Sequence, residues 1–204
     1  MDGTARDAGT VSPGSMGSQA RGLAGRHLAG AAGAVIAMLV TWLKNGKPDV
    51  AMAGNGLLAG LVGVTAGCWV VNGLGAVIIG AIAGLLVVYS VIFWDRMRID
   101  DPVGAISVHG VCGAFGTLAV GLFSATEADG IVKKGLFYGG GTDQLVSQLI
   151  GVVAIGAFVA VTTGILFFVM KKTIGLRVDE IEEIEGLDRH EHGVPGYVND
   201  DMVL

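Results

Sequence analysis

Charged side chains are absent from long stretches of this sequence. None lies between Asp49 and Asp95, and further charge-free runs cover residues 102–126 and 144–170. A shorter charge-free run covers residues 28–43. A helix needs about 20 predominantly apolar residues to cross the hydrocarbon core of a bilayer. The pattern therefore predicts five transmembrane helices. Their expected bounds are residues 27–44, 50–71, 74–94, 102–124 and 144–170.

Composition supports a membrane protein made of helices. Of the 204 residues, 52% are hydrophobic, 15% are charged and 35 are glycine, a balance far from that of a soluble globular domain. A transmembrane barrel would show alternating segments of about 10 residues instead of uniform apolar runs. We expect an all-α integral membrane protein in contact with the lipid bilayer, with no cofactor, no metal and no nucleic-acid partner.

The short loops predict an orientation and a division into parts. If the five spans alternate, residues 44–47, 95–98 and 171–177 share one side, and they are richer in Lys and Arg than the opposite loop 125–143. The positive-inside rule then places the C-terminus in the cytoplasm of a multi-pass protein of the cell membrane. We expect residues 1–26 to be a disordered or non-native arm, 27–173 the transmembrane domain and 174–204 a cytoplasmic tail.

Small residues recur at four-residue spacing within the predicted spans. Such pairs allow helix backbones to approach closely where lipid supplies no hydrophobic drive. Tight helix packing is the favoured interpretation, and a role facing a ligand is the alternative. The pairs are Gly56 and Gly60, Gly63 and Gly67, and Gly80 and Gly84. The two cysteines, Cys68 and Cys112, fall inside spans, so we expect reduced thiols and no disulfide.

The most informative segment surrounds a histidine inside the fourth predicted span. Asp101 and Pro102 are typical of a helix start, because a carboxylate accepts from free N–H groups and proline suits the first turn. His109 follows about two turns later, at a depth where an ionisable side chain is costly. It can be a core histidine with a satisfied hydrogen bond, a metal ligand together with Cys112, or a pore histidine that binds a small polar solute.

Four segments together resemble the ammonium transporter family, from its seventh transmembrane helix to its C-terminus. They are residues 46–48 (GKP), 60–68 (GLVGVTAGC), 100–117 (DDPVGAISVHGVCGAFGT) and 174–178 (IGLRV). The resemblance covers roughly residues 29–204. It implies the second inverted repeat plus the last helix of an eleven-span fold, a homotrimer, and one narrow pore per subunit for ammonium or ammonia. His109 matches the second of two pore histidines, and the other residues expected to line the pore are Ala105, Ile106, Cys112 and Gly113.

The departures from the family bear on function. The first pore histidine, the phenylalanine gate and the outer aromatic site belong to six earlier family spans, and this sequence holds none of them. We therefore expect a truncated transporter that does not enclose a complete pore alone. A non-transporting subunit or an ammonium sensor is the alternative. An enzyme is disfavoured, because the spans offer no nucleophile–base pair and no pair of carboxylates.

The sequence of the tail suggests a regulatory role. Its acidic residues accompany apolar positions at helical spacing, a pattern that also fits a solvated acidic helix. In the family a similar tail packs on the cytoplasmic loops of a neighbouring subunit, and nitrogen-regulatory PII proteins dock on that face. The positions of this tail that match the family are Gly175, Arg177, Gly186 and Asp188.

Overall fold

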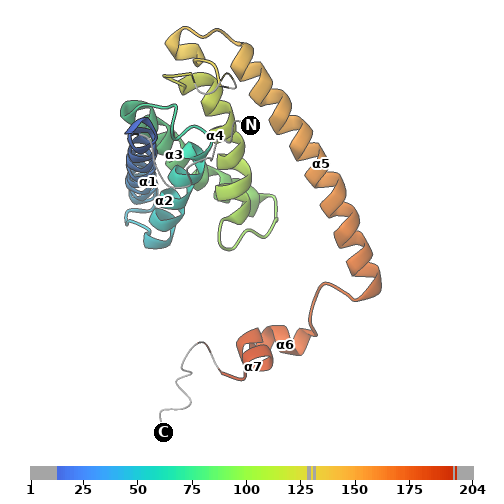
Figure 1. Cartoon of the computed structure of the whole chain (residues 1–204). Helices are drawn as coiled ribbons and strands as arrows, with labels where there is room; N and C mark the ends of the chain where they lie inside the picture. The colour runs from blue at the N-terminus through green and yellow to red at the C-terminus, as the bar shows by residue number, and fades with distance from the viewer. Residues whose placement is uncertain (1–12, 128–129, 131, 195, 197–204) are drawn as a thin grey trace, which may run out of the picture. The chain divides into compact units, whose positions relative to one another are not determined.

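A computed structural model describes residues 13–127, 130, 132–194 and 196. These residues are almost entirely helical (Figure 1), as the sequence predicted. The main helices are α1 (Pro13–Asn45), α2 (Val50–Thr65), α3 (Gly73–Arg96), the π-helical η1 (Ile106–Val111), α4 (Cys112–Phe123) and α5 (Asp143–Thr173). A short 3₁₀ turn, η2 (Leu136–Tyr138), precedes α5, and the tail holds α6 (Glu180–Glu185) and α7 (Leu187–His192).

The five predicted apolar helices are all present. Four helical segments are long and apolar enough to cross a membrane: Gly22–Asn45, Gly73–Arg96, Ile106–Phe123 and Asp143–Thr173. The fifth, α2, is apolar but has only 16 residues. The described residues form two compact units, up to Ala154 and from Ile155 onward, and each is treated by itself below.

The helix α2 ends earlier than predicted. It stops at Thr65, and residues 66–70 form turns in which the Val70 N–H donates to the Gly67 carbonyl at 3.0 Å. Val71 then pairs with Ser124 in an isolated antiparallel bridge. The Asn72 side chain caps α3 by accepting from the Gly75 N–H at 2.8 Å. The apolar composition of residues 66–71 predicted that they belong to the transmembrane helix. The helix stops earlier because residues 70 and 71 form hydrogen bonds to the end of α4.

The helix α1 begins earlier than predicted. It starts at Pro13, so residues 13–26 are helical and not a disordered arm, while residues 1–12 lie outside the described part. Gly25 is buried, and a Cβ added to it would lie 3.5 Å from the Cys68 carbonyl oxygen. The Arg26 guanidinium donates to Cys68 Sγ at 3.5 Å and lies over the Trp69 ring at 5.9 Å. The close approach of α1 to Cys68 is made by a glycine, Gly25, and not by large apolar side chains. The sequence therefore shows no apolar periodicity that would predict the start of the helix.

A ridge of small residues on α1 joins the first three helices, which lie side by side (Figure 1). We define this ridge as Ala29, Gly33 and Ala37, all of them buried. Glycines of both neighbouring helices lie directly against its backbone: a Cβ added to Gly60 of α2 or Gly80 of α3 would collide with Ala29. In the same way Gly56 of α2 and Gly84 of α3 contact Gly33. The predicted role of these glycines in tight packing is confirmed.

The helix α4 joins the bundle through a second glycine contact. A Cβ added to Gly116 would lie 2.5 Å from the Gly63 carbonyl oxygen on α2. Apolar side chains of α2, α3 and η1 fill the space beside this contact, among them Val64, Ile79, Val87 and Val108, each at most 2% exposed. Cys68 and Cys112 are free thiols and buried, as predicted.

We predict that Gly33→Leu strongly destabilises the bundle, because the new side chain would enter a space already occupied by the backbone of α2 at Gly56 and Gly60. Overpacking of such a site costs about 3 kcal/mol, or roughly 10 °C in the unfolding midpoint of a protein of this size. Thermal unfolding in detergent measures the effect. Gly54→Leu is the control, since nothing lies within 4 Å of a Cβ at Gly54; equal midpoints for the two variants would refute this account of the packing.

Candidate functional site

The predicted pore histidine lies in a π-helical turn. The Cys112 N–H donates to the carbonyl of Ser107, five residues earlier, as well as to that of His109. Within η1, Ser107 and Val108 are buried, at 0% and 2% exposure, whereas His109 and Gly110 are exposed. π-helical turns occur in α-helices mostly as single insertions, frequently at functional sites. This turn therefore determines which side chains of the span face the bundle and which face away.

A buried carboxylate holds the start of this turn. Asp101 is 5% exposed, and its two oxygens accept from the Ile106 N–H at 2.9 Å and the Ser107 N–H at 3.2 Å. The Ser107 hydroxyl donates to the same carboxylate at 2.9 Å. Burial raises the pKa of the Asp101 carboxyl, but the hydrogen bonds from Ile106 and Ser107 outweigh it, so the pKa lies below its ordinary value. The charged form is the one that these three donors bind.

The predicted helix start needs one correction. The helix begins at Ile106, after Ala105 as N-cap, and not at Asp101 and Pro102. Pro102 lies in a turn closed by the Gly104 N–H, which donates to the Asp101 carbonyl at 3.0 Å. Gly104 has a φ of +72°, and a Cβ there would lie 2.9 Å from Asn55 Nδ2, so glycine is needed on both counts. Asp101 still accepts from the first free N–H groups of the helix, but from outside it.

The predicted pore residues divide between two sides of the span. Ala105, Ile106 and His109 are exposed, and Gly113 is half-buried, so these four share the outer face of η1 and α4. We call them the open face. Cys112 is 0% exposed and donates to the Ala83 carbonyl of α3 at 3.6 Å, so it lies on the buried side.

The surroundings of His109 bear on the three interpretations left open by the sequence. Among the described residues, no side chain or carbonyl makes a hydrogen bond to its ring, and Cys112 faces away from the open face. The metal interpretation required these two side chains to meet, and the structure does not bring them together. An exposed imidazole in an apolar span can accept and donate hydrogen bonds to a small polar solute.

Comparison with known proteins shows the family of this chain. The model of the Ammonium Transporter Family matches residues 8–197. The chain belongs to the ammonium transporter family. The match begins well before residue 29, where the recognised resemblance started, so part of the N-terminal segment that the sequence analysis set apart falls within the family match.

Several members of the ammonium transporter family are similar to this chain. Ammonium transporter Amt2 of Archaeoglobus fulgidus is 44% identical over 180 residues, which make up 85% of this chain and 38% of that protein. An ammonium transporter of Mycobacterium tuberculosis is 39% identical, with 87% of this chain and 39% of that protein covered. The chain therefore spans less than half the length of these relatives.

Solved structures of the family have the same fold. A structure described as a sensor Amt protein matches with a TM-score of 0.73 and 33% identity, over 89% of this chain and 43% of the other. Mep2 of Candida albicans matches with a TM-score of 0.72 and 30% identity, over 81% and 38%. The membrane-spanning helices described above thus correspond to less than half of each of these structures.

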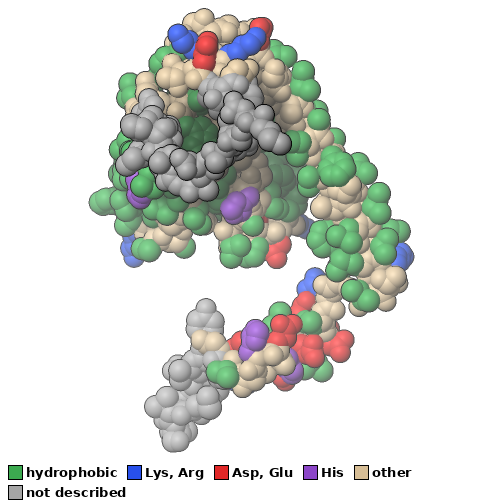
Figure 2. Space-filling model, in the orientation of Figure 1, with side chains coloured by type: hydrophobic (Ala, Val, Ile, Leu, Met, Phe, Trp, Pro, Cys, Tyr) green, Lys and Arg blue, Asp and Glu red, His purple; other side chains and the backbone are tan. Residues whose placement is uncertain are grey.

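The four family positions of the tail all take part in its local structure. Gly175 has a φ of +82° and its N–H donates to the Met170 carbonyl at the end of α5. Arg177 donates from Nε to Glu183 at 2.9 Å and forms an ion pair with the same carboxylate at 2.6 Å. Gly186, with a φ of +97°, separates α6 from α7, and the Asp188 carboxylate accepts from the Gly196 N–H. Figure 2 shows acidic side chains gathered on these tail helices.

Sequence reasoning missed two members of the site. Ser107 is the buried partner of Asp101, and Gly104 provides the turn between the carboxylate and the helix. An Asp followed six residues later by Ser in an apolar segment was the available signal. It was not used, because ordinary capping motifs place the partner two or three residues away.

We predict that Asp101→Asn destabilises the protein at pH 7 by about 1.5–3 kcal/mol, the usual contribution of hydrogen bonds to a charged group. Because the folded-state pKa lies below the unfolded value of about 3.9, the carboxylate stabilises fully above that pH and ceases to do so as the pH falls through the folded-state pKa. The difference in unfolding midpoint between wild type and variant should therefore be constant from pH 7 to about pH 4 and should close as the pH falls further, through the folded-state pKa. Asp100→Asn, at an exposed position, is the control; a gap independent of pH would contradict the role of the charge.

Proposed function

We propose that the chain forms part of the wall of an ammonium-conducting pore, with His109 as its pore histidine. One observation carries the proposal: an imidazole is exposed on a π-turn, in the first turn of an apolar span. Ionisable side chains at membrane depth are costly and generally mark a solute path or a buried pair. Because the chain belongs to the ammonium transporter family, we propose ammonium as the solute.

The chemistry of the open face suits an ion that must lose its charge. Bringing a bare ammonium ion into an apolar lumen carries a large desolvation penalty. A neutral imidazole nitrogen of His109 accepts a hydrogen bond from ammonium and can take its proton, which leaves ammonia to pass along an apolar path. Ala105, Ile106 and Gly113 provide that apolar lining and, being small or aliphatic, leave room beside the ring.

The open face is only one side of such a path. Described residues pack against the buried side of η1 and α4, through α2 and α3, and leave His109 exposed. The chain also spans 38% of the length of its Archaeoglobus fulgidus relative. We propose that the opposite wall comes from outside these 204 residues and that this chain alone does not enclose a pore.

The proposed function includes an orientation in the membrane and a state of assembly. The chain is a multi-pass membrane protein, and we place its C-terminus in the cytoplasm, because alternation of the five spans would put Lys44, Lys47, Arg96 and Arg98 on the same side as Lys171. A homotrimer is supported by an exposed apolar groove of about 400 Å³ between α1 and α3, which a neighbouring subunit can cover.

The tail is the proposed regulatory element. Ile181 and Ile184 are 67% and 79% exposed on an otherwise acidic helix, a combination that suits docking on basic cytoplasmic loops. A nitrogen-regulatory PII protein is the partner that the family resemblance proposes for that face.

A sensor is the second candidate function. It is favoured by the similarity, at 33% identity and a TM-score of 0.73, to a structure described as a sensor Amt protein. A sensor would bind ammonium at the same open face and change the state of the tail without net passage. Binding without uptake distinguishes it from a transporter.

The test is reconstitution of uptake from two parts. The chain is co-produced with the N-terminal remainder of a full-length relative, such as Amt2 of Archaeoglobus fulgidus, in cells without their own ammonium transporters. We predict labelled methylammonium uptake only when both parts are present. His109→Ala should lower it about 100-fold, the usual scale for loss of a proton-handling side chain.

His27→Ala is the matched control, because His27 also lies in a membrane helix but bonds the Leu23 carbonyl of its own helix at 2.8 Å. Full uptake by His109→Ala would refute the pore-histidine role. Ammonium binding by the two-part complex without any uptake would favour the sensor.

A further inference from the structure

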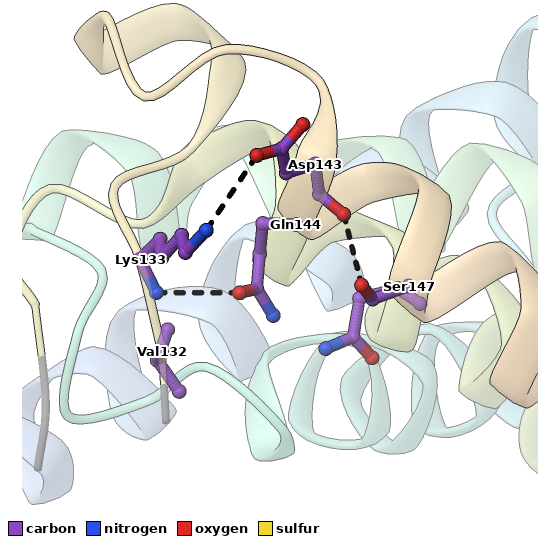
Figure 3. Close-up of a pocket in the computed structure, with 6 residues that line it drawn as sticks. Val132, Lys133, Asp143, Gln144 and Ser147 are labelled. Atoms are coloured by element: carbon purple, nitrogen blue, oxygen red, sulfur yellow. Dashed lines mark hydrogen bonds and ion pairs between the residues drawn. The ribbon is translucent and has the colours of Figure 1, made fainter. Parts of the chain in front are cut away.

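A polar cavity of about 330 Å³ lies where the loop after α4 meets the first turns of α5 (Figure 3). It is separate from the open face. Its lining residues come from residues 132–133 and from the N-terminal end of α5: Val132, Lys133, Asp143, Gln144, Ser147 and Gln148.

Two opposite charges flank this cavity. Lys133 Nζ lies 3.5 Å from Asp143 Oδ2, and the two side chains are 63% and 78% exposed. A strong charge-assisted hydrogen bond would be about 2.7–2.9 Å long, and exposed ion pairs contribute little to stability. Lys133 and Asp143 can therefore each bind a group of a ligand at small cost.

A buried amide lies beside these charges. Gln144 is 7% exposed, and its Oε1 accepts from the Lys133 N–H at 3.2 Å. This bond orients the side chain so that Nε2 is the other end of the amide, and Nε2 donates to none of the residues that the structure describes. Figure 3 shows Gln144 between Lys133 and Ser147. The cavity thus offers an ammonium and an amide donor beside a carboxylate acceptor.

An apolar surface adjoins the cavity. Residues 149–154 of α5 follow Gln148 directly, are all apolar, and none of them is buried. The nearby turn η2 exposes Phe137 and Tyr138, at 63% and 37%, and tyrosine is typical of the membrane–water interface. A ligand here meets charged groups at one end and a lipid-facing helix at the other.

We propose that this cavity binds the headgroup of a zwitterionic phospholipid that carries a primary ammonium. Its phosphate accepts from Lys133 Nζ and Gln144 Nε2, its ammonium donates to Asp143, and its acyl chains lie along α5. A soluble phosphoethanolamine has the same headgroup chemistry, but it would gain nothing from the apolar residues 149–154. This site does not depend on the function proposed for the open face.

Lipid binding to the purified full chain in detergent tests the proposal. Native mass spectrometry compares phosphatidylethanolamine with phosphatidylcholine of the same acyl chains. We expect the ethanolamine lipid to bind more tightly, because its ammonium can donate to Asp143 and a quaternary ammonium cannot. Lys133→Gln should weaken its binding about tenfold. Lys134→Gln is the matched control, since Lys134 is an exposed neighbour that does not line the cavity.

A second variant tests the proposed hydrogen bond between the lipid ammonium and Asp143. Asp143→Asn should abolish the preference for ethanolamine over choline while leaving lipid bound. Equal affinity of Lys133→Gln and Lys134→Gln, or no preference between the two lipids in the wild type, would overturn the proposal. Displacement of the lipid by an equal concentration of free phosphoethanolamine would instead assign the cavity to a water-soluble solute, and would overturn it too.

Discussion

Backbone contact along the ridge of α1 is the constraint on which the transmembrane bundle depends. Ala29 and Gly33 each lie against a glycine of α2 and a glycine of α3, so that three helices meet with no side chain larger than a methyl group between them. Lipid is as apolar as the helices, so close van der Waals packing must hold them together. The bundle is consequently intolerant of added volume at these positions and indifferent to it at Gly54, where a Cβ meets open space.

The open face follows from this packing. Because α2 and α3 are held by the ridge, Gly63 of α2 is available to receive Gly116 of α4. The span that carries His109 is thereby fixed near its middle by glycine packing and before its start by the carboxylate of Asp101. Between these two attachments the π-turn buries Ser107 and turns the imidazole outward. The pore role proposed for His109 depends on this outward orientation of its side chain.

The sequence predicted those features that composition alone determines. Charge-free runs located the five apolar helices, and Gly56, Gly60, Gly80 and Gly84 announced the packing, because in a membrane small residues are themselves the signal. It failed where a local hydrogen bond outweighed apolar composition: α2 ends at Thr65, and the helix after Asp101 begins late. Cys112 was expected to line the pore beside His109, on the strength of the resemblance, and the structure instead buries it against Ala83.

Photo-crosslinking tests the central claim, that the open face is one wall of a pore closed by another part of the transporter. A photoreactive amino acid replaces Ile106, which is 38% exposed in η1, in the chain co-produced with the N-terminal remainder of a relative. We expect a covalent adduct between the two parts in membranes that take up methylammonium. Adducts formed only with a second copy of this chain, or none at all while uptake proceeds, would contradict it.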